Sequence, residues 1–238
     1  MQLNLPFMAS TFFAALKAVP ITLQITIVAL LLAVPAGFCM ALCIIYRIKI
    51  LKQLSMLYIS FIRGTPIVLQ ILIIYSLMPS LLNAWFKTWG WSFNIFDINP
   101  IFYAFIVFAM NNAAQLAELF RSSILAVDKG QYEAALASGL TPVQSYIRII
   151  IPQALVTALP NLCNLVIILI KNTSLAFMMT VRDITATARI EASYGYNYVE
   201  AYLDIFVIYI IICALVQILF GRLTPKYAMI NSRRTLRG

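Results

Sequence analysis

The sequence contains no histidine, and only eight of its 238 residues are acidic. Histidine and carboxylates perform most general acid and base catalysis, so the chain has little material for such chemistry. Its four cysteines (Cys39, Cys43, Cys163 and Cys213) lie in apolar runs without the paired spacing of metal or disulfide sites. We therefore expect a protein that is not an enzyme, binds no metal, and uses its cysteines as small apolar side chains.

Charged residues are also scarce: they make up 11% of the chain, whereas hydrophobic residues make up 63%. Ordinary soluble domains have about 25% charged and about 45–50% apolar residues, so a water-soluble domain is excluded. The apolar runs are continuous and do not alternate with polar residues, which excludes membrane-spanning strands. The composition predicts an all-α integral membrane protein.

Five segments meet the requirement of about 20 mostly apolar residues for a helix that crosses a bilayer. They are residues 20–46, 57–80, 101–125, 152–172 and 203–222. We expect these five transmembrane helices to form one domain over residues 1–238. Residues 5–18 are too short to cross alone and are expected to form a helix at the outer interface, or else to extend the first span.

Lysine and arginine are distributed unevenly between the loops, and 12 of the 17 fall on one side of the predicted membrane. These are Arg47, Lys49, Lys52, Arg63, Arg121, Lys129, Arg148, Arg222, Lys226, Arg233, Arg234 and Arg237. Because cations are retained in the cytoplasm, the N-terminus is predicted outside and the C-terminus inside. The net charge of +9 then reflects topology and contact with membrane lipid, so no nucleic-acid partner is expected.

The composition of the predicted cytoplasmic loop at residues 126–151 differs both from that of an apolar membrane span and from that of a disordered segment. Residues 133–138 favour a helix, Gly139 suits a helix end, and Thr141 with Pro142 is a start signal for a second helix. The small side chains of Ala134 and Ala135 would let the backbone approach a partner closely. The loop is therefore predicted to be two short helices that dock on a partner, although a merely connecting hairpin would have the same composition.

The order Glu133-Ala134-Ala135, three residues and Gly139 resembles the EAA motif of the coupling loop in membrane permease subunits of ATP-binding-cassette (ABC) importers. Residues 61–70, 117–124 and 170–175 resemble the polar amino-acid permeases of the histidine, glutamine and cystine type. The resemblance covers nearly the whole chain. Two departures are Ser122-Ser123, where the family commonly has Gly-Gly, and Asn172, where it often has aspartate.

This resemblance implies a type I ABC importer permease architecture with a cytoplasmic coupling helix in a bacterial cytoplasmic membrane. The implied ATPase-coupling residues are Asp128, Gly130, Glu133, Ala134, Ala135 and Gly139. The implied partners are an ABC ATPase subunit dimer, a second permease copy or paralogue, and an extracytoplasmic substrate-binding protein. ATP and Mg²⁺ would bind the ATPase, since this chain lacks the phosphate-binding loop Gly-x-x-x-x-Gly-Lys-Ser/Thr and binds no cofactor itself.

Polar side chains at membrane depth are costly and usually face a wet cavity or another helix, so each is a candidate for the substrate pathway. The candidates are Gln70, Asn111, Asn112, Gln115, Asn161, Asn164, Asn172, Thr173 and Ser174. Hydrogen bonding between helices is the alternative role for these residues. Lys171 would either attract an amino acid's carboxylate or extend to the outer interface.

Glu118 and Arg121 are predicted to form a structural ion pair with each other or with Arg63, and gating or coupling to the loop is the alternative role. Glu118 is the only acid that the sequence places clearly inside a span, which disfavours an ion-coupled secondary transporter. We therefore expect the transmembrane subunit of an ATP-driven importer that moves an amino acid into the cytoplasm by alternating access. The resemblance favours cystine or a related polar amino acid; a secondary amino-acid transporter and a non-transporting scaffold are the alternatives.

Overall fold

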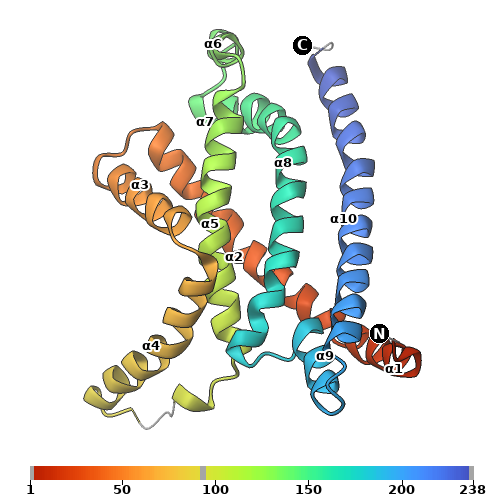
Figure 1. Cartoon of the computed structure of the whole chain (residues 1–238). Coiled ribbons are helices and arrows are strands. Elements are labelled where there is room, and N and C mark those ends of the chain that lie inside the picture. The colour runs from red at the N-terminus through yellow and green to blue at the C-terminus, as the bar shows by residue number, and fades with distance from the viewer. Residues whose placement is uncertain (1–2, 92–94, 236–238) are drawn as a thin grey trace.

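The computed structural model describes residues 3–91 and 95–235, with the side chains of the last helix described as far as Arg222. This part of the chain is helical and contains no strand. In Figure 1, α5, α8 and α10 run along the length of the molecule while α2 crosses it obliquely. One end carries α6 and the opposite end carries α1 and α9, and these are called the α6 end and the α9 end below.

The helix bounds follow the expected apolar segments at most positions. The helices are α1 (Leu5–Leu16), α2 (Val19–Ile45), α3 (Lys49–Gly64), α4 (Ile67–Thr88), η1 (Ile95–Asp97), α5 (Ile101–Leu125), α6 (Lys129–Ala137), α7 (Pro142–Ser145), η2 (Tyr146–Ile150), α8 (Ile151–Asn172), η3 (Thr173–Met179), α9 (Ile184–Ser193) and α10 (Tyr198–Thr235). The predicted spans at 20–46, 101–125 and 152–172 therefore coincide with α2, α5 and α8 within one residue at each end. The segment at 5–18 forms α1, a separate short helix.

The predicted span at 57–80 is wrong, because the chain breaks there into α3 and α4. Thr65 is extended, with φ −116° and ψ 139°, as the residue before a proline prefers. Pro66 has no N–H to continue the helix and instead begins α4. The apolar segment that can cross a membrane is accordingly α4, residues 67–88, and α3 is a distinct helix with its own charged residues.

Four helical stretches of the described chain are long and apolar enough to cross a membrane: Leu5–Ile45, Ile67–Thr88, Pro142–Met179 and Tyr198–Arg222. The predicted count of five is therefore one too high on this criterion, because α5 does not qualify. Its second half carries the amides and charges from Asn111 to Arg121. It can carry them because α2, α3, α4 and α8 all pack against it, so that protein and not lipid surrounds most of this helix.

The most extensive helix pairing among the described residues joins α2 and α5 and includes small side chains. A Cβ atom on Gly37 would lie 2.9 Å from the carbonyl oxygen of Ala113 and 2.9 Å from Cβ of Leu116. Ala29 and Ala33 on α2 are also buried, whereas much of the opposite face of α2 is exposed. Small residues let two backbones approach where lipid provides no hydrophobic driving force, so this contact fixes the oblique crossing of α2.

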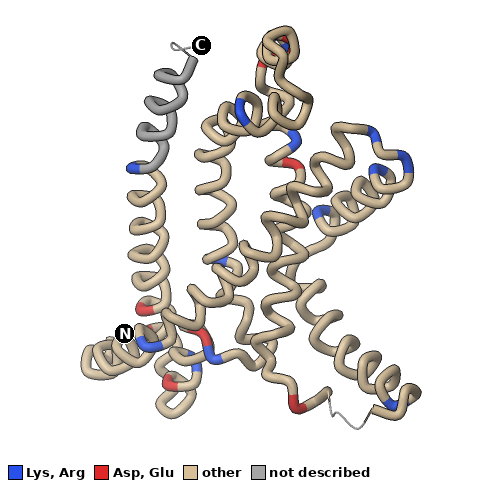
Figure 2. Tube along the Cα trace, turned by 180° about the vertical axis from the view of Figure 1, so that it is seen from behind, with Lys and Arg blue, Asp and Glu red and all other residues tan. Residues whose placement is uncertain are grey.

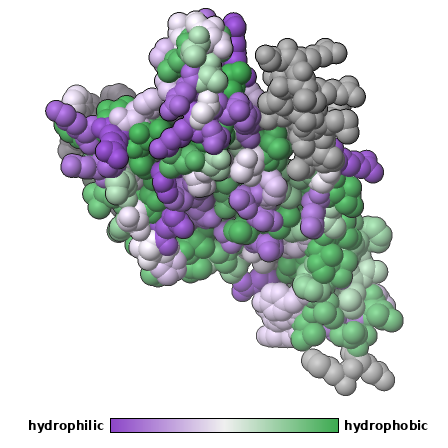
Figure 3. All heavy atoms as spheres, turned by 90° about the horizontal axis from the view of Figure 1, so that it is seen from above, coloured by the Kyte–Doolittle hydropathy of each residue, from purple (hydrophilic) through white to green (hydrophobic). Residues whose placement is uncertain are grey.

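Charge is concentrated at the two ends of the molecule. Figure 2 shows mainly lysines and arginines, with a few acids, around the α6 end, and both signs of charge at the α9 end. Figure 3, viewed onto the α6 end, shows hydrophilic residues gathered over that end and apolar residues along the flanks. The predicted cations at positions 226, 233 and 234 lie beyond the described side chains, and Arg237 lies outside the described residues.

Candidate functional site

Three of the predicted pathway residues form a chain of amide hydrogen bonds. Asn111 Nδ2 donates to Gln70 Oε1 at 3.1 Å, which joins α5 to α4, and Gln115 Nε2 donates to Asn111 Oδ1 at 2.9 Å. Gln70 and Asn111 are buried within this single chain. Their amide groups are therefore used in helix packing, the alternative role that the sequence left open.

Gln70 has a second structural task at the break between α3 and α4. Its Nε2 lies 2.9 Å from the carbonyl oxygen of Ile62, 3.1 Å from that of Thr65 and 2.9 Å from the hydroxyl of Thr65. The break leaves carbonyl groups at the end of α3 without helical partners, and such groups must be satisfied internally at membrane depth. Gln70 therefore holds the break in a defined geometry.

Three further candidates donate to backbone carbonyls three or four residues earlier in the chain. Asn112 Nδ2 donates to the carbonyl oxygen of Phe108, and the hydroxyls of Thr173 and Ser174 donate to those of Ile170 and Lys171. Asn112 and Thr173 are buried, and Ser174 is half-buried. These three side chains are therefore engaged in local hydrogen bonds to the backbone.

An exposed polar stripe runs along α8. Asn161, Asn164 and Lys171 are exposed and lie three and seven residues apart, so they share one helical face. Thr157, which the sequence reasoning missed, extends this face by one turn. The stripe is about 21 Å long at 1.5 Å per residue, which is too long for lipid to solvate cheaply within a hydrocarbon core of about 30 Å. Asn172, beside it, is half-buried.

The helical spacing of Thr157 could have revealed it, because it lies four residues before Asn161 on a helix interrupted only by Pro160. Sequence alone does not show which face of α8 the protein covers. In the fold, Ala154, Ala158 and Cys163 are buried and turn the polar stripe outward. The polar stripe of α8 (Thr157, Asn161, Asn164 and Lys171) is therefore the polar surface at membrane depth that is available to a ligand or to a second chain.

Glu118 and Arg121 form an ion pair on α5, with both guanidinium Nε and Nη2 bonded to the carboxylate. Two contacts from one guanidinium fix its orientation as well as its distance. About a third of each side chain remains exposed, so solvent can screen part of their attraction. Arg63 is not in this pair, although its charge acts on Glu118 from a greater distance.

Three buried acids, Asp183, Glu200 and Asp204, lie near the α9 end. Asp183 is fully buried and caps α9 through a 2.8 Å hydrogen bond from the N–H of Ala186. Burial raises the pKa of Asp183 to about 6, although the bond from Ala186 acts to lower it. Glu200 on α10 is also buried. Asp204 on α10 is buried and lies within the stretch Tyr198–Arg222 that can cross a membrane, so the expectation that Glu118 is the only acid clearly inside a span is wrong. Its position, at the second residue of the predicted span 203–222, was the available signal.

The predicted coupling loop has the expected outline of two short helices and a turn. The Asp128 side chain caps α6 by accepting a 2.7 Å hydrogen bond from the N–H of Gly130. Gly139 ends it with φ +84°, a conformation that other residues adopt only with strain. Thr141 and Gln144 then form a capping box that starts α7. The loop is thus locally encoded and well defined.

The surface of α6 is small and open. Glu133, Ala134 and Gly139 are exposed, whereas Ala135 is buried against the loop. No atom lies within 4 Å of a Cβ built on Gly139, so the turn faces open space. Figure 1 shows α6 projecting beyond the ends of α5 and α8. The geometry leaves the backbone of α6 accessible to a partner.

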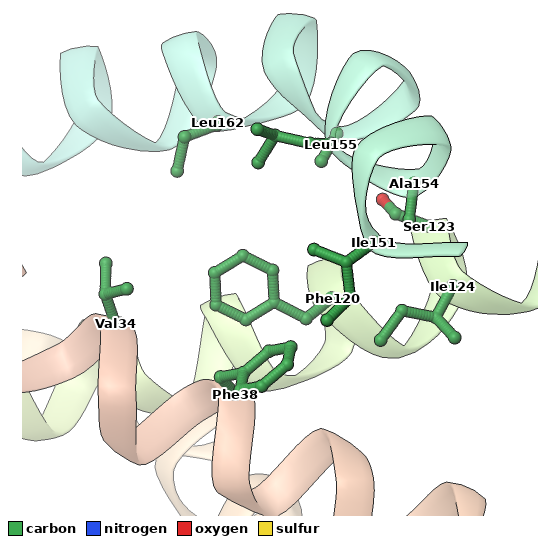
Figure 4. A pocket seen from close by; sticks show the side chains of 10 residues that line it. Val34, Phe38, Phe120, Ser123, Ile124, Ile151, Ala154, Leu155 and Leu162 are labelled. Atoms are coloured by element: carbon green, nitrogen blue, oxygen red, sulfur yellow. The ribbon is translucent and has the colours of Figure 1, made fainter. Parts of the chain in front are cut away.

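An apolar cavity of about 260 Å³ lies between α2, α5 and α8 toward the α6 end. Figure 4 shows Phe38 and Phe120 pointing into it, with Leu155 and Leu162 on the opposite wall. The two rings pack edge to face at 5.8 Å between centroids. A cavity with this lining lacks partners for an amino acid's charged groups, so the polar stripe of α8 is the better candidate for a polar substrate.

Residues 33–229 match the family model described as "Binding-protein-dependent transport system inner membrane component". The chain is 40% identical to the probable amino-acid permease protein YxeN of Bacillus subtilis over 92% of its own length and 95% of that protein. It is 36% identical to the L-cystine transport system permease protein TcyL of Bacillus subtilis, over 95% and 92% respectively. Other relatives are named as octopine and glutamine transport permeases.

A solved amino acid ABC transporter has a similar fold, with a TM-score of 0.79 and 30% identity over 95% of this chain and 100% of that chain. The chain therefore belongs to the family of binding-protein-dependent transport system inner membrane components, within its amino-acid ABC permeases. It is a multi-pass membrane transport subunit and not a catalytic subunit. The resemblance found in the sequence is confirmed.

Proposed function

We propose that this chain is the translocation subunit of an ATP-driven importer that carries a polar amino acid, with cystine as the first candidate. The observation that carries the proposal is the polar stripe of α8, which is exposed in a single chain at a depth where lipid would otherwise contact it. A second copy of the permease, or a paralogue, would face this stripe and enclose a path between the two chains. Asn161 and Asn164 would then line that path.

The loop at the α6 end would receive the ATPase dimer, which binds ATP and Mg²⁺. Asp128, Gly130 and Gly139 would set the shape of α6, and Glu133 and Ala134 would contact the ATPase directly. The exposure of α6 supports this role. The excess of cations at this end supports its placement in the cytoplasm, with the N-terminus outside.

Asn111, Asn112, Gln115 and Gln70 would support the pathway by fixing α4 and α5, and Thr173 and Ser174 would shape its outer end beside Asn172. Glu118 and Arg121 would brace the inner end of α5 near Arg63. The choice of cystine rests on the similarity to an L-cystine permease. An extracytoplasmic binding protein would deliver the amino acid to the α9 end.

The proposal is tested by reconstituting the chain in vesicles with its ATPase and binding protein and measuring uptake of labelled cystine, glutamine and octopine. We expect ATP-dependent uptake of one of them. Ala134→Glu should abolish coupling because it puts bulk and charge on the docking surface, whereas Ala134→Ser should retain it. Asn164→Leu should lower uptake at least about tenfold, and Ile168→Leu on the same exposed face of α8 should not.

Uptake that follows an ion gradient and ignores ATP would overturn the proposal and favour a secondary transporter. Uptake of glutamine or octopine in place of cystine would correct only the substrate. If Ala134→Glu and Ala134→Ser were equally active, the ATPase would not dock on this face of α6. Size-exclusion elution identical to wild type would show that each variant is folded.

A further inference from the structure

A cavity at the α9 end contains two arginines and belongs to none of the sites described above. It measures about 480 Å³ and is lined by Phe177, Thr180, Arg182, Ala186, Arg189, Ile190, Ser193 and Tyr198. These residues come from η3, the connection between η3 and α9, α9 itself and the start of α10. Two cations in one concave surface favour an anionic ligand.

The wall of this cavity is fixed by contacts on both sides of Arg182. Thr180 adopts the left-handed conformation at φ 59°, and its hydroxyl lies 3.0 Å from that of Tyr75 on α4. Asp183, the residue after Arg182, is anchored by its cap on α9. The short segment between the two anchors therefore holds the backbone of Arg182 in place, which lowers the entropic cost of binding.

Arg189 is held differently, by stacking on an aromatic ring. Its guanidinium carbon lies 4.3 Å from the centroid of the Phe177 ring. Such stacking orients the planar guanidinium while leaving its N–H groups available for an acceptor. Neither Arg182 nor Arg189 has an ion-pair partner among the residues that the structure describes.

The turn that connects α9 to α10, beside the cavity, carries two highly exposed tyrosines. Tyr194 and Tyr196 are 83% and 86% exposed, and they lie in the turn between Ser193 and Tyr198, both of which line the cavity. Tyr196 adopts φ 55°, a left-handed conformation that non-glycine residues adopt infrequently. Tyrosine and arginine are the residue types most enriched at the energetic centres of protein interfaces.

We propose that this surface, Arg182, Arg189, Tyr194 and Tyr196, docks the extracytoplasmic binding protein by receiving an acidic side chain of that protein between the two arginines. The inference rests on the proposed function and adds to it a specific contact site on this chain. Charge complementarity is the argument for an acidic partner, because no carboxylate of the described residues forms an ion pair with either arginine. The exposed tyrosines favour a protein surface, since their rings supply rigid contact area.

The test measures binding of substrate-loaded binding protein to the permease–ATPase complex in nanodiscs of fixed neutral lipid composition. Arg182→Gln/Arg189→Gln should raise the Kd at least about fivefold, and increasing salt should weaken wild-type binding more than binding of the variant. Lys87→Gln, which removes a cation of α4 from outside the cavity, should leave the Kd unchanged. Size-exclusion and thermal unfolding profiles equal to wild type establish that the variants fold.

An unchanged Kd in the double variant would overturn the inference. If the Kd were unchanged but uptake at saturating binding protein depended differently on the substrate concentration, the inference would also fail. That result would show that the cavity holds the free amino acid. If the Kd of the double variant differed from that of wild type only in nanodiscs that contain anionic lipid, the arginines would be assigned to lipid headgroups. If wild type binds the partner with the expected arginine dependence but shows no ATP-driven uptake, the proposed function fails and this docking site remains.

Discussion

The side-chain amide of Asn111 donates a 3.1 Å hydrogen bond to Gln70 Oε1 and so joins α5 to the first turn of α4. Gln70 uses its own amide nitrogen to bond three oxygens at the end of α3. A single side chain thus satisfies the broken backbone and fixes the helix that follows it. Asn111 on α5 is thereby linked, through Gln70, to the break between α3 and α4.

Gln70→Leu should destabilise the chain by about 1–3 kcal/mol, because it leaves the amide of Asn111 and the carbonyl of Ile62 without partners in a buried setting. The free energy of unfolding in mixed micelles measures the loss. Gln24→Leu, the same change at an exposed position of α2, is the control and should cost little. Equal losses in the two variants would show that the Gln70 bonds contribute nothing specific.

Gly37→Ala should weaken the contact between α2 and α5 by about 1–3 kcal/mol, because the added carbon would lie within 3.0 Å of the backbone of α5. Gly64→Ala is the matched control, since no atom lies within 4 Å of a Cβ at that position. It should be neutral or stabilising by up to about 1 kcal/mol. Thermal unfolding in detergent compares the two, and a stable Gly37→Ala variant would contradict the close packing described here.

Asp183 should make stability depend on pH. Its pKa is raised to about 6 in the folded chain, above the ordinary value of about 3.9, so the folded state binds the proton more tightly than the unfolded state. Its contribution is therefore most favourable below pH 4 and is lost as the pH rises from about 4 to about 6. Asp183→Asn keeps an N-cap acceptor and should flatten this part of the curve of unfolding temperature against pH. A curve identical to wild type would rule out Asp183 as the source.

The ion pair of Glu118 and Arg121 should contribute only modestly, because each side chain is about a third exposed. A double-mutant cycle with Glu118→Gln and Arg121→Gln should give a coupling free energy of about 0.2–1 kcal/mol. Uptake measured on the same four proteins separates bracing from gating. A transport loss far beyond the stability loss, restored in the double variant, would show that the pair acts as a gate.

Local sequence determined the structure of the loop at residues 126–151 well, and the physical reason is that its signals act over a few residues. Asp128, Gly139 and Thr141 each cap or end a helix through contacts within four positions. The breaking effect of Pro66 is equally local, yet the predicted span at 57–80 ran through it. Apolar residues on both sides of the break hid the change from the amphipathic α3 to the apolar α4.

Composition and apolar runs by themselves determined that this is a helical membrane protein, because burial in lipid requires long apolar segments with internally bonded backbones. The tertiary structure decided which polar residues are used for packing and which are available. Asn111 and Asn161 have the same side chain at comparable depth, but neighbouring helices cover the first and leave the second exposed. That difference arises from contacts between residues far apart in the chain, which helical periodicity alone does not reveal.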